Sequence, residues 1–183
     1  FKLTAQASAD ITEVTLSYAI TGRGTSALGK PSDLAAGKTL STSVAVQVNS
    51  GSSYIPVGSD FIYHWEVTAA DGTVAKSEEA RFLFLPPNKE WKTVKGDIMT
   101  VYFAGDREQL AQAYLRAGLQ TYDKIGKQLL NTTLAQPPVK VILFDTEREL
   151  ETARVSEGRR DQVVTNCGVK VATDIVFVIP ISC

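Results

Sequence analysis

The sequence has one histidine, His64, among its 183 residues. Hydrolytic zinc sites need several ligands, usually histidines together with a carboxylate or a cysteine. Serine and cysteine nucleophiles also depend on a histidine base, and the chain has no Gly-x-Ser-x-Gly motif to present a serine. His64 lies between Tyr63 and Trp65 in an expected strand, and we interpret it as a solvent-facing or edge residue. We therefore assign no catalytic residue, no metal ligand and no cofactor, which leaves enzymatic activity uncertain.

The sequence also lacks an excess of charge of one sign and a long hydrophobic run. The 19 Lys+Arg residues balance 20 Asp+Glu residues, and no basic cluster is present that would neutralise phosphates. The glycines of "TGRGTSALGK" are expected in a loop between strands, not in a phosphate-binding turn before a helix. The longest apolar run, "DIVFVIPIS", contains Pro180 and is shorter than the roughly 18 residues of a spanning helix. We expect no nucleic-acid partner and no membrane span in this chain.

Cysteine is scarce, with only Cys167 and Cys183. The first residue is Phe1 rather than Met, which predicts a processed chain or an excised fragment and favours an extracytoplasmic location, whether secreted, periplasmic or cell-surface. In an exported protein an even pair of cysteines favours a disulfide, and the alternative is a pair of buried reduced thiols. A bond between Cys167 and Cys183 would contribute about 3 kcal/mol and staple the final strand to the preceding segment.

Residues 1–88 are predicted to form an all-β domain. "KLTAQASA", "TEVTLSYAITG" and "TLSTSVAVQVNSG" alternate apolar and polar residues, as half-buried strands do. Two longer strands follow, joined by a tight turn at "ADGT". In "FIYHWEV" the period of two places Phe61, Tyr63, Trp65 and Val67 on the core face. The pattern indicates a β-sandwich of immunoglobulin-like or fibronectin-like type.

A second domain, 89–183, is predicted after the prolines of "LPPNKEW", with the boundary near Pro87. "DIMTVYFAG" predicts a strand and "DREQLAQAYLRAGLQTYDKIGKQLL" a long helix, in which Asp106 is the expected N-cap and Gln109 its capping partner. "PPVKVILFD" predicts a buried strand, and Thr146 with Glu149 a capping box that begins a second helix. "KVATDIVFVIPIS" adds a final strand or hairpin. The expected apolar stripe of the long helix consists of Leu110, Tyr114, Ala117, Leu119, Tyr122, Ile125 and Leu129.

This order of elements predicts an α/β or α+β domain that is incomplete. About three strands and two helices would leave one apolar face of the sheet half covered, so we expect another helix, another domain or a partner chain to cover it.

Several other features have an ordinary structural explanation. Glu147, Glu149 and Glu151 are paired-carboxylate candidates for glycoside hydrolysis, but we interpret them as the solvated start of a helix. Arg159 and Arg160 are flanked by acidic residues and are typical of a surface ion-pair patch. Asn131 begins an "NTT" sequon, a glycosylation candidate in a eukaryotic secretory protein. Tyr54 and Trp91 lie in expected connections, and we consider both to be candidate interface residues between the two domains.

The stretches "SDFIYHWEVTAADGTVAKSEEARFLF", "EWKTVKGDIMTVYFAGD" and "VKVILFDTERELE" resemble the peptidase MA-like proteins of exported bacterial type. In that family an I-x-Y-x-W strand closes an immunoglobulin-like domain and a tryptophan opens the next. Tyr63, Trp65 and Trp91 occupy the matching places. The resemblance implies a gluzincin-type zinc peptidase fold, whose His-Glu-x-x-His helix would follow the strand that corresponds to "DIVFVIPIS". The chain ends before that helix, so the resemblance transfers no zinc ligand and no general base.

Two functions from different classes remain. The first is a non-catalytic, extracytoplasmic binding or assembly module that contacts a protein partner or copies of itself. The second is the N-terminal fragment of a secreted zinc metallopeptidase whose catalytic helix lies beyond residue 183.

Overall fold

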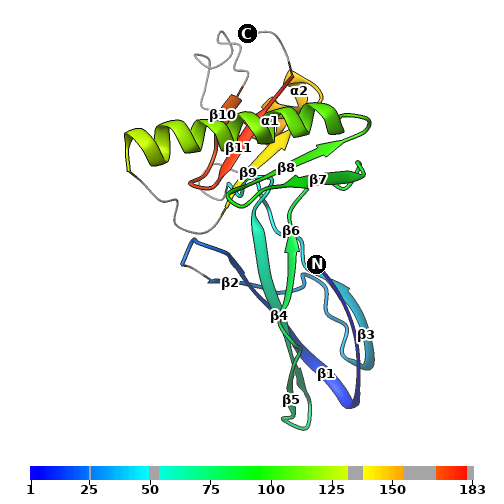
Figure 1. The fold of residues 1–183 in the computed structure, drawn as a ribbon. Helices are drawn as coiled ribbons and strands as arrows, with labels where there is room; N and C mark the ends of the chain where they lie inside the picture. The colour runs from blue at the N-terminus through cyan, green and yellow to red at the C-terminus, as the bar shows by residue number, and fades with distance from the viewer. Residues whose placement is uncertain (25, 50–53, 132–137, 155–167, 181–183) are drawn as a thin grey trace. The chain divides into compact units, whose positions relative to one another are not determined.

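The computed structural model describes residues 1–24, 26–49, 54–131, 138–154 and 168–180. Within these ranges the chain is mostly β, with eleven strands in two sheets, two α-helices and one π-helix (Figure 1). This confirms the expected β-rich fold. The chain forms two compact units: the first contains Phe1–Val48 and Ser59–Phe84, and the second contains Asn49–Gly58 and Leu85–Cys183. The predicted boundary near Pro87 thus lies three residues after the division at Phe84, and a short segment from the predicted first domain belongs with the second unit.

The first unit contains one antiparallel sheet built around its first strand. β1 pairs with β3 along its first half and with β2 near its end, while β4 lies on its opposite edge and carries β5 and β6 on its own far edge. The strands are β1 (Lys2–Ile20), β2 (Ser26–Gly29), β3 (Gly37–Ser43), β4 (Asp60–Ala69), β5 (Val74–Lys76) and β6 (Ala80–Leu83).

The two strands predicted within residues 2–22 are the two halves of β1. The apolar residues occupy odd positions from Leu3 to Ile11 and even positions from Val14 to Ile20, so the buried face changes phase between Ile11 and Val14. The register with β4 shifts between Ile11 and Glu13, as a β-bulge does when it inserts one extra residue. The bulge keeps both halves of one long strand facing a core.

The core of the first unit forms because this sheet packs against itself. Trp65 of β4 and Leu16 of β1 are buried at 4% and 0% exposure. Phe1 is the residue before β1. Its ring centroid lies 5.0 Å from that of Tyr63 in β4 and 5.5 Å from that of Phe82 in β6. Both sides of this core therefore come from one continuous six-stranded sheet.

Strand β4 confirms the predicted core face. Phe61 and Trp65 are buried, Tyr63 and Val67 pack against the core, and His64 points to the other face, where it is half-buried. The predicted turn is also present: the Thr73 amide donates to Asp71 Oδ1 at 2.9 Å, and Gly72 has a φ of 84°.

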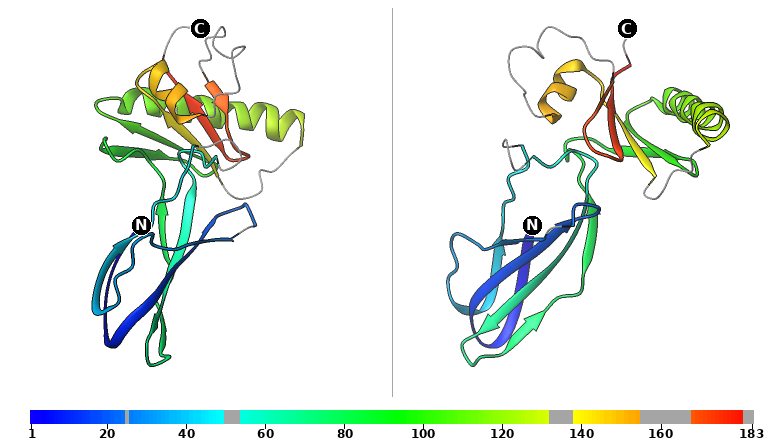
Figure 2. Two further views of the ribbon diagram at one scale, coloured as in Figure 1. Left: turned by 180° about the vertical axis from the view of Figure 1, so that it is seen from behind. Right: turned by 90° about the vertical axis from the view of Figure 1, so that its left-hand side faces the viewer.

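The second unit has a mixed sheet with a helix on each face. The strand order is β10-β11-β9-β8-β7, in which β8, β9 and β11 are parallel and the two outer strands are antiparallel. Figure 2 shows α1 and α2 on opposite faces. The elements are β7 (Trp91–Lys95), β8 (Met99–Ala104), α1 (Glu108–Thr121), the π-helix Tyr122–Leu129, β9 (Val139–Leu143), α2 (Glu147–Ala153), β10 (Gly168–Lys170) and β11 (Ile175–Val178).

The long helix differs from its prediction at both ends. Its N-cap is Arg107 rather than Asp106, and among the described residues no side chain caps it by a hydrogen bond. From Tyr122 the helix continues as a π-helix, which turns more slowly and so rotates later side chains off the apolar stripe. Ile125 and Leu129, expected on the core face, are 48% and 75% exposed.

The sheet face opposite α1 is covered by other parts of the chain. Its central residues Ile142, Ile175 and Phe177 are 0%, 2% and 0% exposed. Helix α2 lies on this side (Figure 2), and the segment Tyr54–Gly58 packs there as well. The chain itself therefore covers this face. No helix in the described ranges is long and apolar enough to cross a membrane.

Candidate functional site

Four charged side chains meet at the carboxyl edge of the parallel strands in the second unit. β8 is followed by a turn that leads to Arg107, and β9 is followed by Phe144 and Asp145. In open α/β sheets ligands bind outside the carboxyl ends of the strands, so this edge is where a site is first looked for. The cluster consists of Lys89, Arg107, Asp145 and Glu149.

Asp145 is the centre of the cluster. Its two carboxylate oxygens lie 2.6 Å from Lys89 Nζ and 3.1 Å from Arg107 Nε. Lys89 Nζ also donates to Glu149 Oε2 at 2.6 Å, and the same Oε2 accepts the Asp145 amide at 3.0 Å. Two cations and two carboxylates therefore neutralise one another.

The start of α2 holds Glu149 in place. Thr146 is the N-cap, and its hydroxyl accepts the Glu149 amide at 3.2 Å, which confirms that part of the predicted capping box. The Glu149 carboxylate extends back to the Asp145 amide and to Lys89, so Glu149 belongs to an ion-pair network and is not the solvated residue that was expected. Glu151 pairs with Arg154, and Glu147 is exposed.

The environment of Lys89 favours its charged form. Burial by itself lowers the pKa of Lys89, whose side chain is 15% exposed, but the hydrogen bonds and charges of Asp145 and Glu149 outweigh burial and raise the pKa above 10.5. A lysine held protonated in this way is a poor general base. The cluster is suited to joining three connections of the chain, not to transferring protons.

The cluster does not form a metal site. It has two carboxylates, and both are already paired with cations. Among the described residues no group of three His, Cys, Asp or Glu side chains could hold a metal ion. Arg107 Nη1 is buried and has no hydrogen-bond partner among the residues that the structure describes.

The predicted interface residues make contacts inside the second unit. The Tyr54 hydroxyl donates to the carbonyl of Ala153 at 2.8 Å, at the end of α2. Trp91 is the first residue of β7 rather than part of a connection; its indole N–H donates to the Pro86 carbonyl at 2.9 Å, and its ring meets Phe144 edge-on. Their predicted role at an interface between domains stays a prediction.

The remaining predicted residues are placed as follows. Cys167 and Cys183 lie outside the described residues, as do Arg159 and Arg160, so the disulfide stays a prediction. Asn131 is exposed and has a φ of 45°. His64 lies in the first unit, whereas the charged cluster belongs to the second.

We did not predict Lys89, Arg107 or Asp145 as site residues from the sequence. Asp145 and Arg107 each follow a predicted strand closely, and polar residues after parallel strands are a signal that could have indicated this edge. Lys89 lies in the linker after two prolines, where no periodic pattern points to a partner.

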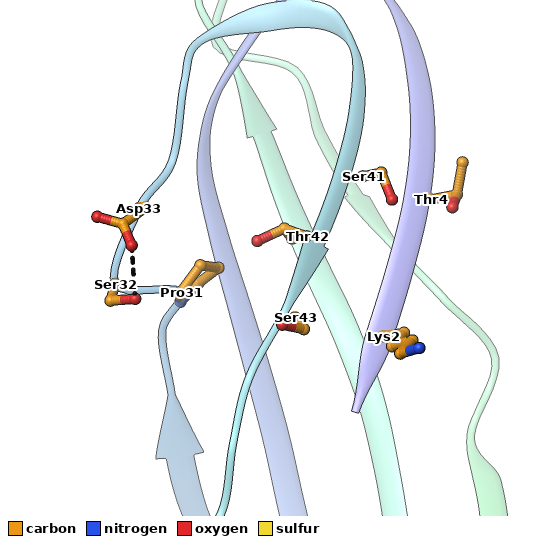
Figure 3. A pocket seen from close by; sticks show the side chains of 8 residues that line it. All are labelled: Lys2, Thr4, Pro31, Ser32, Asp33, Ser41, Thr42 and Ser43. Carbon is orange, nitrogen blue, oxygen red and sulfur yellow. Dashed lines mark hydrogen bonds between the residues drawn. The ribbon is translucent and has the colours of Figure 1, made fainter.

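The first unit has an open concavity of about 460 Å³ beside β1 and β3 (Figure 3). Its lining is rich in hydroxyl groups, and the Ser32 hydroxyl donates to Asp33 at 3.1 Å. The lining residues include no aromatic ring, so a sugar would find no stacking surface there. They are Lys2, Thr4, Pro31, Ser32, Asp33, Ser41, Thr42 and Ser43.

Comparison of the chain with family models, with curated proteins and with solved structures found no match.

Proposed function

We propose that the protein is a non-catalytic, extracytoplasmic binding or assembly module, which associates with a second copy of itself. The observation that carries this proposal is the exposed apolar end of the long helix. Ile125, Leu129 and Leu130 are 48%, 75% and 62% exposed, and they follow one another at a spacing that places them together. Large apolar side chains gathered at one place are typical of contact surfaces.

The charges around this surface favour a second copy over an unrelated partner. Asp123 and Lys127 stand two residues before and two residues after Ile125 and form an ion pair with each other at 2.7 Å, so the helix end presents one charge of each sign. In an antiparallel pair of these helix ends the two ion pairs would lie side by side, with each carboxylate next to the other copy's ammonium group. Such a contact is self-complementary, as a two-fold interface requires. Because it is small, we expect a weak association.

Sedimentation across protein concentrations tests this proposal. The intact chain should form dimers at concentrations of about 100 μM, and Leu129→Gln should shift the equilibrium to monomers at least about tenfold. Leu28→Gln is the matched control, because Leu28 is 71% exposed in the first unit and should leave the dimer unchanged. A monomer at every concentration, or an equal effect of both variants, would contradict the proposal.

We also propose an immunoglobulin-like or fibronectin-like class for the first unit and an incomplete second domain. An immunoglobulin-like or fibronectin-like class for the first unit is supported by its antiparallel strands and its buried Trp65. The incomplete character of the second domain is supported by half-buried Val176 and Val178 of β11, which pair with Val141 and Leu143 on the α1 side of the sheet. Helix α1 packs on β7 and β8, at the other end of the sheet.

That half-covered strip also favours a second candidate function, the N-terminal fragment of a secreted zinc metallopeptidase. A further helix beside α1 would cover these two valines. In the peptidase family that the sequence resembles, the helix that follows the strand matching "DIVFVIPIS" carries His-Glu-x-x-His. The encoding gene decides: this motif shortly after codon 183 would support the peptidase, and a stop codon directly there would rule it out.

A further inference from the structure

The chain passes between the two compact units three times, after Val48, after Gly58 and after Phe84. The second unit therefore contains a short piece taken from between β3 and β4 of the first. Its described part, Tyr54–Gly58, forms no helix or strand, and yet Ile55–Ser59 are all buried. Irregular segments normally run over a protein surface, so a buried one has a packing role.

This segment, which we name the clasp (Tyr54–Gly58), packs into the second unit. Ile55 and Val57 are 8% and 6% exposed, and the Tyr54 hydroxyl donates to the Ala153 carbonyl at 2.8 Å. At Gly58 a Cβ atom would lie 3.0 Å from Ile142 Cδ1 and 3.4 Å from Ile175 Cγ2. The clasp backbone thus lies directly against the sheet face that α1 does not cover.

The residue after the clasp belongs to the first unit. The Ser59 carbonyl accepts the Phe84 amide at 2.8 Å, and the Asp60 carbonyl accepts the Thr21 amide at 3.0 Å. Gly58 is held in the second unit, and Ser59, the next residue, is held in the first. No flexible linker therefore separates the two units at this point of the chain.

We propose that the clasp couples the stability of the two units. When the start of β4 leaves its place in the first unit, Ser59 no longer anchors the adjacent Gly58, the clasp leaves its position, and Ile142 and Ile175 lose their cover. An event that opens the first unit therefore loosens the second, although the two have separate cores.

The two tryptophans of the chain provide a probe for each unit, since Trp65 lies in the first and Trp91 in the second. Urea unfolding of the full chain is followed by fluorescence in two single-tryptophan proteins, Trp91→Phe and Trp65→Phe. Leu16→Ala, a fully buried change in the first unit, is then added to each. Both midpoints should fall together, because the clasp passes the loss to the second unit. A fall confined to the Trp65 signal would overturn the proposal.

A second pair of variants tests whether the clasp carries the coupling. With Ile55→Ala and Val57→Ala present, adding Leu16→Ala should move the Trp91 midpoint by less than half the shift seen with the native clasp. Leu28→Ala, at an exposed position of the first unit, is the control and should leave the coupling unchanged. If both midpoints still fall equally in the weakened clasp, another route couples the units and the proposal fails.

The clasp double variant also has a readout that separates local loosening of the covered face from unfolding of the whole second unit. Amide exchange is measured at Ile142 and Phe177, which lie on the covered face, and at Phe103, on the α1 face. Exchange should accelerate at least tenfold more at the first two than at Phe103. Equal acceleration at all three, including complete unfolding of the second unit with the first intact, would overturn the clasp as a local cover.

Discussion

Gly58 has two independent reasons to be glycine. Its φ of 89° lies in the left-handed region, which is unfavourable for residues with a Cβ atom. The added Cβ would also approach Ile142, which is fully buried and cannot move aside without disturbing the sheet. Gly72 has a similar φ of 84°, but nothing lies within 4 Å of its Cβ position.

Alanine substitutions at these two glycines should separate the cost of backbone strain from the cost of overpacking. Gly72→Ala should destabilise the protein by about 1 kcal/mol, the cost of the strained backbone alone. Gly58→Ala should cost about 2–4 kcal/mol, because overpacking adds to the same strain. Urea denaturation of both variants measures the difference, and equal losses would show that the clasp is not tightly packed at Gly58.

Lys89 gives a second residue-scale prediction, and its sign follows from its raised pKa. Since the pKa of Lys89 in the folded protein lies above 10.5, its contribution to stability is complete below that pH and is lost as the pH rises through the folded value. Lys89→Met should therefore lower the unfolding free energy by about 1–2 kcal/mol at neutral pH, and the difference from the native protein should shrink above about pH 10.5.

The control for Lys89 is Lys127, which also has a raised pKa because it pairs with Asp123 on the helix surface. Its side chain is 56% exposed, and exposed pairs contribute little to stability. Lys127→Met should thus have a clearly smaller effect at neutral pH. A difference between Lys89→Met and native protein that stays constant to pH 12 would contradict the ion-pair explanation.

At the scale of elements, the long helix buries one part of its predicted stripe and exposes another. Leu115 is 6% exposed in the core with Val101 and Phe103, whereas Leu129 projects from the π-helix at 75% exposure. Leu115→Ala should cost about 2–5 kcal/mol, and Leu129→Ala less than about 0.5 kcal/mol. Thermal unfolding of the two variants at a low protein concentration, where the chain is monomeric, measures both; similar losses would mean that the helix end is packed.

How far each element was predictable depends on whether its cause is local. The turn at Asp71 and Gly72 and the N-cap at Thr146 follow from the chemistry of a few neighbouring residues, and both were predicted. The change of period at Tyr122 was not, because a π-helix has no local signature in "TYDKIGK" and the apolar spacing fits an α-helix equally well. The continuity of β1 was not predicted, although the apolar residues change from odd to even positions after Ile11, as they do at a β-bulge within one strand.

At the scale of the whole chain, the strand–helix–strand–helix order of residues 98–153 predicted a small sheet with helices packed on it, but not the segment that covers part of one face. "YIPVG" is apolar and contains a proline, so local pattern alone marks it as a connection. Its assignment to the second unit depends on contacts with Ile142 and Ile175, more than 80 residues later, and no periodicity encodes such a contact. For the same reason the ion pairs of Lys89 with Asp145 and Glu149 could not be predicted.

The covered sheet face leads to a prediction for a fragment that begins at Leu85. This fragment contains every strand of the second sheet and both helices but lacks the clasp, so Ile142 and Ile175 should be exposed in it. It should bind a dye for apolar surface, as loosely packed states do, while the full chain binds little. A peptide of residues 54–58 should displace the dye, and the same peptide with serine in place of Ile55 and Val57 should not. The apolar contacts of those two side chains are what the clasp adds, so a fragment that excludes the dye without any peptide would mean that the sheet is complete without the clasp.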